Sequence, residues 1–187
     1  PQPMKEEYLL TGPLEPTNEP YAVAKIAGIT MCRAYNRQYG TRFVSVMPTN
    51  LYGPGDNFDL QDSHVLAALI RKFCDAEATG AREVTVWGSG TPRREFLYVD
   101  DMADACLFVM NHYEGDGFLN IGTGTDITIE DLAGLIRDVT GFDGVIRFDP
   151  SRPDGTPQKL LDVSRLTALG WTHRIPLRKG IEKTCRW

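Results

Sequence analysis

The sequence has no long apolar run, no initiator methionine and no cluster of basic residues. A membrane span needs roughly 18 uninterrupted apolar residues, so we expect no transmembrane segment. The opening stretch, PQPMKEEYLL, lacks the apolar centre of a secretion signal. The net charge is −5. Because an acidic chain without clustered Lys and Arg neutralises phosphates poorly, we expect no nucleic-acid partner.

Cysteine and histidine are too sparse and too scattered to predict a metal site. The chain has three histidines and four cysteines, and no CxxC pair. Most of the cysteines fall in apolar helical patterns. We therefore interpret them as reduced, structural thiols of a cytoplasmic protein; they are Cys32, Cys74, Cys106 and Cys185.

The remaining composition is that of an ordinary globular chain: 187 residues, 42% hydrophobic and 24% charged. This length suits one domain or a piece of a larger one. Helical and strand patterns alternate, which predicts the α/β class. We expect helices over 18–40, 64–73, 99–113 and 128–141 and in two terminal stretches, and strands over 42–48, 83–90, 94–99, 118–122, 144–149 and 159–163.

Three local expectations are more specific. The apolar run 42–48 is typical of a strand buried on both faces, and a polar loop rich in Gly and Pro follows it. The NIGTG segment, 120–124, lacks phosphate-loop spacing and predicts a tight strand-to-helix turn. Thr128 and Asp131 have the spacing of a capping-box variant at a helix start.

The first helix carries a pair of residues with catalytic potential. Tyr21 and Lys25 are four positions apart and so lie on one helix face. The Lys25 ammonium can make the Tyr21 phenol a better proton donor toward a carbonyl oxygen. Such a YxxxK spacing arises by chance in roughly one chain in three of this composition, so the pair alone is weak evidence. The following strand ends at Pro48-Thr49-Asn50-Leu51, and ligands collect at the carboxyl ends of parallel strands.

Several blocks in fixed order resemble the extended short-chain dehydrogenase/reductase family, in particular its members that act on GDP-sugars. The resemblance covers essentially the whole chain. It implies the C-terminal portion of that fold, without the N-terminal Rossmann dinucleotide-binding half. Residues 1–60 would be the tail end of the Rossmann-type core, and residues 61–187 mostly a substrate-binding α/β domain. The blocks are LEPTNEPYAVAKIAG, SVMPTNLYGPGDNF, SHVLAALIRKF, VWGSGTPRREFLYVDDMA, LNIGTG and PDGTPQKLLDVSRL.

The resemblance also implies a reaction: NADP-dependent 3,5-epimerisation and 4-reduction of GDP-4-dehydro-6-deoxy-D-mannose to GDP-L-fucose. In the family pattern, Tyr21 donates the proton at C4, and Lys25 assists it and holds the nicotinamide ribose. His64 matches the epimerisation acid and a cofactor contact, although a lone His at a helix start is more often a surface or capping residue. The residues that would line the nicotinamide of NADP(H) are Pro48, Thr49, Asn50 and Leu51.

Four further positions match substrate contacts of the family. Lys72 and Arg94 offer cations for the diphosphate, and the Trp87 ring suits a base or sugar face. Asp154 matches a nucleotide-sugar contact. Each residue also has a structural interpretation: a solvated lysine, a surface arginine in an ion pair, a core tryptophan, and an aspartate that nucleates its Pro-Asp-Gly turn.

The family's glycine-rich turn, catalytic Ser and epimerisation Cys would all precede residue 1. We therefore expect the isolated chain to be inactive, to keep part of a GDP-sugar site, and to form a homodimer or self-associate through exposed sheet edge and apolar surface. Three alternatives stay open: another nucleotide-sugar epimerase or dehydratase, a nucleotide-sugar-binding module without chemistry, and a structural domain with no ligand.

Overall fold

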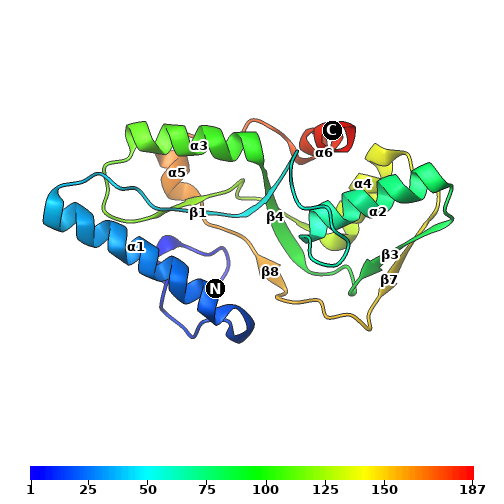
Figure 1. Cartoon of the computed structure of the whole chain (residues 1–187), viewed down its shortest axis with the longest axis horizontal. Helices are drawn as coiled ribbons and strands as arrows, with labels where there is room; N and C mark the ends of the chain where they lie inside the picture. The colour runs from blue at the N-terminus through cyan, green and yellow to red at the C-terminus, as the bar shows by residue number, and fades with distance from the viewer.

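The computed structural model describes residues 1–187 and confirms the α/β class. The molecule is elongated, and helices and strands are distributed along its whole length (Figure 1). The helices are α1 Glu19–Tyr39, α2 Val65–Thr79, α3 Val99–His112, α4 Ile129–Thr140, α5 Ser164–Ala168 and α6 Leu177–Arg186, with 3-10 turns at Glu6–Tyr8 and Pro16–Asn18. The strands are β1 Val46–Pro48, β2 Asn50–Tyr52, β3 Glu83–Trp87, β4 Arg93–Tyr98, β5 Leu119–Ile121, β6 Asp126–Thr128, β7 Val145–Asp149 and β8 Gln158–Lys159.

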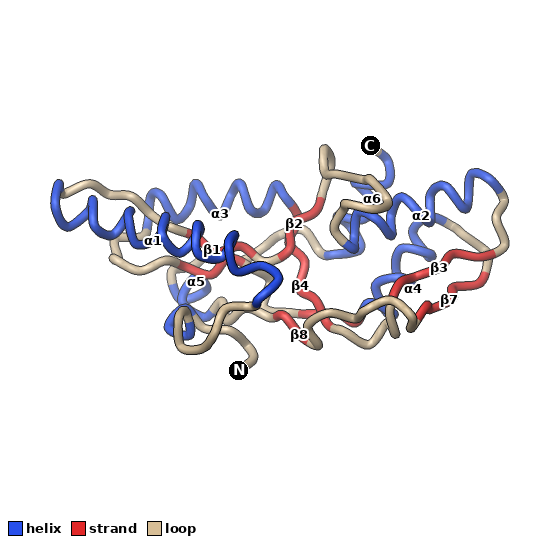
Figure 2. The backbone as a smooth tube through the Cα atoms, turned by 60° about the horizontal axis from the view of Figure 1, so that its bottom comes forward, coloured by secondary structure: helices blue, strands red, loops and turns tan.

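The strands form three small groups. β1 pairs with β5, and β3 pairs with β7, both in parallel. β4 lies between these groups; it pairs in parallel with β2 and β8 and antiparallel with β6. Figure 2 shows α1, α3 and α5 around β1 at one end, and α2 and α4 beside β3 and β7 at the other.

Each end of the molecule has its own apolar core. One core joins α2, α4, α6 and β3, and its fully buried side chains include Phe73, Leu132 and Ile181. The second core joins β1, β5, α3 and α5 and centres on Leu119 and Ile121. Elements from beyond residue 60 therefore contribute to both cores. None of the helices combines the length and apolarity that crossing a bilayer requires.

The helix boundaries follow from local signals that are visible in the sequence. Gly40, Gly80 and Gly141 end α1, α2 and α4 in the left-handed conformation, which costs glycine least. The Thr128 hydroxyl accepts a hydrogen bond from Asp131 N at 3.0 Å, which confirms the predicted cap of α4.

Several strand predictions were wrong. Within 42–48 only residues 46–48 form a strand, and none of the seven is fully buried, so this run does not have two covered faces. Residues 50–52 form β2 rather than the start of the loop. NIGTG leads into β6 rather than directly into a helix, and only 158–159 is a strand where 159–163 was expected. All these strands have two or three residues, too few to show a periodicity.

A buried carboxylate ties the short strands together. Glu95 in β4 is 0% exposed. Its Oε1 accepts hydrogen bonds from Thr123 N at 2.6 Å and Gly124 N at 2.7 Å, and its Oε2 accepts one from Leu161 N at 2.9 Å. Because a buried charge is tolerated only when it is well hydrogen-bonded, these three amides make the position of Glu95 possible. The side chain fixes the loop after β5 and the segment after β8 against β4.

Candidate functional site

The structure places Tyr21 and Lys25 together on the exposed surface of α1. Lys25 Nζ lies 5.3 Å from the centroid of the Tyr21 ring. Tyr21 is 60% exposed, and its hydroxyl makes no hydrogen bond within the chain. The N-terminal end of α1, which carries both residues, is the end nearer to β8 in Figures 1 and 2. A phenol placed in this way is free to donate a proton to a ligand; its catalytic role stays a prediction.

The segment from Pro48 to Leu51 is held rigidly. Thr49 Oγ1 and Asn50 Nδ2 both donate hydrogen bonds to the Glu95 carbonyl, at 3.2 and 2.7 Å. Leu51 packs against the second core. Because these three side chains already make contacts within the protein, a ligand at this strand end would contact the exposed ring of Pro48 and the backbone.

His64 is exposed and directly precedes α2, where its side chain makes no capping bond. The residue before it has an unusual environment. Ser63 Oγ is the single buried side-chain nitrogen or oxygen of residues 1–187 without a hydrogen-bond partner. A buried hydroxyl without a partner costs about 1–3 kcal/mol, which a ligand with a polar group can offset. Ser63 was not predicted from the sequence, since a serine in a polar loop carries no distinguishing signal.

Two cations flank the Trp87 ring at the end of β3. Lys72 Nζ lies 5.0 Å from the ring centroid, and the guanidinium carbon of Arg152 lies 4.9 Å from it. Lys72 also donates a hydrogen bond to Thr85 O at 2.9 Å, and burial lowers its pKa. Trp87 is 49% exposed. Cations over an indole face stabilise this arrangement and keep the ring and both charges near solvent.

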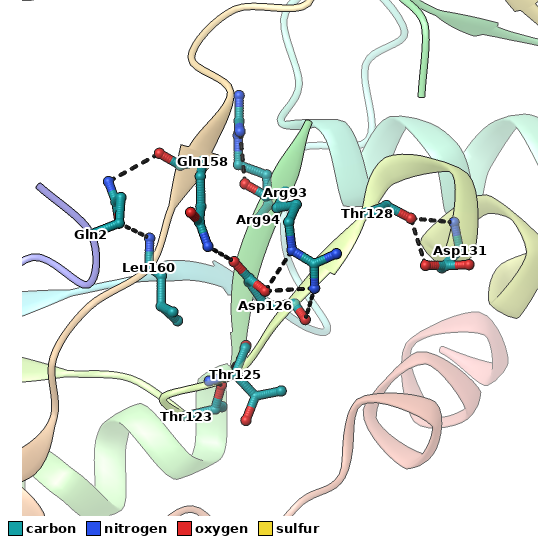
Figure 3. Close-up of polar contacts among 10 residues, drawn as sticks. All are labelled: Gln2, Arg93, Arg94, Thr123, Thr125, Asp126, Thr128, Asp131, Gln158 and Leu160. Atoms are coloured by element: carbon teal, nitrogen blue, oxygen red, sulfur yellow. Dashed lines mark hydrogen bonds and ion pairs between the residues drawn. The ribbon is translucent and has the colours of Figure 1, made fainter. Parts of the chain in front are cut away.

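The loop after β7 brings two more of the predicted residues to the same place. Asp154 accepts hydrogen bonds from Ser89 N at 2.6 Å and from Ser89 Oγ at 2.8 Å. The Arg94 guanidinium lies beside Gly155, 3.5 Å from the position that a Cβ atom would occupy there. Figure 3 shows Arg94 extending away from the Arg93–Asp126 ion pair on the neighbouring position of β4. The residues predicted to hold substrate therefore gather around one loop.

The charges of this cluster are unbalanced. Lys72, Arg94 and Arg152 have no carboxylate within 4.0 Å, whereas Arg93 pairs with Asp126. Burial lowers the pKa of Arg94. Cations that form no ion pair favour an anionic ligand such as a diphosphate. Arg152 also belongs to this cluster but was not predicted from the sequence. The available signal was its position two residues before Asp154 in the same turn.

The cluster lies beyond the carboxyl ends of β3 and β7, where ligands bind in parallel α/β proteins. Fold and cluster together define an α/β protein with a group of cations at parallel strand ends. The model of the NAD dependent epimerase/dehydratase family matches residues 1–122, and the chain belongs to that family.

Relatives with curated names resemble the whole chain. GDP-L-fucose synthase of Escherichia coli (strain K12) is 56% identical over 195 residues, and GDP-L-fucose synthase 1 of Arabidopsis thaliana is 55% identical over 187. Both alignments cover 100% of this chain but only 61% and 58% of the relatives. The structure of a GDP-L-fucose synthetase from Naegleria fowleri bound to NADP superposes with a TM-score of 0.93 and 33% identity, covering 100% of this chain and 60% of that one.

Proposed function

We propose that the chain is the substrate-holding part of an NADP-dependent enzyme that converts GDP-4-dehydro-6-deoxy-D-mannose into GDP-L-fucose. The observation that carries this proposal is the cluster of unpaired cations around Trp87 at the ends of β3 and β7. The names of the relatives support the choice of a GDP-sugar. The division at residue 60, with the catalytic helix before it and mostly substrate binding after it, is part of the same proposal.

In this proposal the cations hold the diphosphate. Arg94 can bind two phosphate oxygens with its planar fork, and Lys72 and Arg152 add charge beside the Trp87 ring. The half-exposed Trp87 ring offers a flat face to the base or the sugar. Asp154 acts through Ser89: since both of its oxygens accept bonds from that residue, it positions the loop that carries Arg152.

Tyr21 and His64 would carry the proton transfers. The C4 ketone acidifies the hydrogens on C3 and C5, so those centres can be inverted when a base removes the proton from one face and His64, as the acid, returns a proton to the other. Ser63, whose buried hydroxyl lacks a partner, directly precedes His64 in the sequence. Tyr21 then donates a proton to the C4 oxygen during reduction. NADPH, when bound, supplies the hydride to C4.

The residues that would contact the nicotinamide end of NADP(H) fit that role. Lys25 is exposed and has no carboxylate partner, so its ammonium can donate to ribose hydroxyls. Pro48 presents an apolar ring beside the rigid Thr49–Leu51 segment. The sequence contains no glycine-rich turn to hold the cofactor pyrophosphate. We therefore propose that these 187 residues alone bind a GDP-sugar without turning it over.

Calorimetric titration of the 187-residue chain with GDP, UDP and CDP tests the substrate class. We expect GDP to bind most tightly, and Lys72→Ala to weaken its binding by about tenfold, the value of one charge-assisted hydrogen bond. Arg71→Ala is the matched control, because Arg71 precedes Lys72 on α2 and pairs with Asp75 at the surface. Tighter binding of UDP or CDP would favour another nucleotide-sugar enzyme, and no binding of any of them would contradict the proposal.

The reaction is tested with the N-terminal segment of the Escherichia coli relative fused before Pro1. With the keto-sugar nucleotide, NADPH oxidation by this fusion should fall about 10²–10⁴-fold in Tyr21→Phe, while GDP affinity stays unchanged. Tyr39→Phe, at an exposed tyrosine of the same helix, is the control. Full activity of Tyr21→Phe would exclude its catalytic role and leave a binding module as the better account.

We further propose that the 187-residue chain self-associates through α1. No residue of this helix is fully buried, and its exposed apolar side chains form a surface of the kind that mediates association. Light scattering should give a mass above that of the monomer, and Met31→Lys should lower it. A monomer at all concentrations would contradict this. The exposed residues are Val23, Met31, Tyr35, Tyr39 and, just beyond the helix, Phe43.

A further inference from the structure

Two cysteines that the proposed reaction does not use lie against each other at the interface of α2 and α6. Cys74 is in the last part of α2, and Cys185 is near the end of α6, the last helix of the chain. Both pack on the edge of the first core, and both are partly exposed. α2 and α6 contact each other, and each of the two thiols shifts the pKa of the other.

The surroundings make this pair accessible and reactive. Both cysteines line a surface cleft of about 400 Å³ whose other residues include Glu77, Glu182 and Arg186. The neighbouring Cys185 thiol lowers the pKa of Cys74 to about 7 and outweighs the opposing effects of burial, Asp75 and Glu77. The proximity of Cys74 raises the pKa of Cys185. One sulfur is thus prepared to attack as a thiolate while the other stays protonated until the second step.

We propose that Cys74 and Cys185 form a reversible disulfide that fastens α6 to α2. No group of three or more His, Cys, Asp or Glu side chains is placed to hold a metal ion, so metal binding does not account for the pair. The inference rests on the geometry of the two helices and is independent of the proposed reaction with a GDP-sugar.

The oxidant is a low-molecular-weight disulfide. The Cys74 thiolate attacks one sulfur of that disulfide, a mixed disulfide forms, and the first small thiolate leaves. That thiolate, or solvent, takes the proton of Cys185, whose sulfur then attacks Cys74 Sγ and expels the second small thiol. Two protein thiols are oxidised and one small disulfide is reduced to two thiols. A dithiol reductant reverses both steps.

The expected consequence is a tighter attachment of the C-terminal helix. α6 packs against the first core through Ile181, which is 0% exposed. It is also attached by a hydrogen bond of 3.3 Å that Tyr52 Oη donates to Leu177 O. A cross-link from α6 to α2 closes a loop on the order of 100 residues, which strongly restricts the unfolded chain. We expect the melting temperature to rise by about 5–10 °C on oxidation.

Mass spectrometry of peptides tests the pair directly. The dilute 187-residue protein is incubated with glutathione disulfide near neutral pH, and free thiols and linked peptides are counted with and without a dithiol reductant. We expect loss of two of the four thiols, one linked Cys74–Cys185 peptide and a raised melting temperature, all reversed by reduction. Cys185→Ser should instead keep a glutathione adduct on Cys74, with no rise in melting temperature.

Cys106→Ser is the matched control, since burial raises the pKa of Cys106 and it should react slowly. This variant should still form the Cys74–Cys185 link. Iodoacetamide should alkylate Cys74 of the Cys106→Ser variant about tenfold faster than it alkylates Cys106 of the Cys74→Ser variant. Retention of four free thiols at saturating oxidant, or linkage of Cys74 to any other cysteine, would overturn the proposal.

Discussion

Asp154 accepts hydrogen bonds from Ser89 through both of its carboxylate oxygens, at 2.6 and 2.8 Å, across 65 positions of sequence. Ser89 follows β3 and Asp154 follows β7, so this contact continues the pairing of the two strands into their loops. It also fixes the distance between Trp87 and Arg152, which lie two residues before Ser89 and Asp154 respectively. Asp154 is thus a positioning residue for the cation cluster.

Replacing Asp154 by Ala should loosen this loop. We expect GDP binding by the 187-residue chain to weaken by about five- to tenfold, because Arg152 is no longer held over Trp87. The free energy of unfolding should fall by only about 1 kcal/mol, since the bonds lie at the surface. Calorimetry and urea unfolding measure the two effects. Asp116→Ala, at an exposed aspartate without hydrogen bonds, should change neither; equal GDP affinity of both variants would contradict the positioning role.

The buried carboxylate of Glu95 should be among the most sensitive positions of the fold. In Glu95→Gln one oxygen becomes an NH₂ group that faces backbone N–H donors, so at least one amide loses its partner. We expect a loss of about 2–4 kcal/mol in the free energy of unfolding, measured with urea. Glu114→Gln, which removes a surface ion pair with Arg42, should cost less than about 0.5 kcal/mol. Similarly small losses in the free energy of unfolding of both variants would contradict the stabilising role of Glu95.

Replacing either of two helical glycines by Ala should change the stability of the protein, in opposite directions for the two positions. Gly180 in α6 lies against the Tyr52 hydroxyl and 2.9 Å from the Tyr98 ring, measured from the position of an added Cβ. Overpacking there should destabilise the protein by about 1–3 kcal/mol. Gly134 in α4 has open space around it, so Gly134→Ala should stabilise by up to about 1 kcal/mol. Thermal unfolding distinguishes them, and stabilisation by Gly180→Ala would contradict the packing of α6.

The turn that carries Arg152 should depend on pH. Ser151 donates two hydrogen bonds to Asp149 Oδ1, and these bonds lower the pKa of Asp149. A carboxylate with a lowered folded pKa stabilises the protein above its unfolded value of about 4, and this contribution disappears as pH falls through the folded value. Urea unfolding at about pH 7 and about pH 3 should therefore show a smaller loss on acidification in Asp149→Asn than in the unchanged protein. The exposed Asp143→Asn variant should keep the full loss.

The sequence predicts what depends on neighbouring residues and misses what depends on distant pairing. Tyr21 and Lys25 are four residues apart in one long helix, so their proximity needs no knowledge of the fold. The contact of Arg152 with Trp87 exists because Trp87 pairs with Asp149 across 62 positions, and no local pattern reports that register. β2, β6 and β8 have two or three residues each and form because β4 offers hydrogen bonds to all three. Residues 42–48 looked fully buried because their composition records hydrophobicity but not which neighbours cover it.

The Glu95 carboxylate accepts hydrogen bonds from the backbone N–H groups of Thr123, Gly124 and Leu161. An amide hydrogen is supplied by every residue type except proline. Most substitutions at position 123 therefore preserve the donor, whereas position 95 needs an acidic side chain of the right length. Positions 124 and 161 are restricted for other reasons, since Gly124 has a left-handed backbone and Leu161 is buried. A saturation library of this region should accordingly yield many functional residues at position 123 and almost none besides glutamate at position 95.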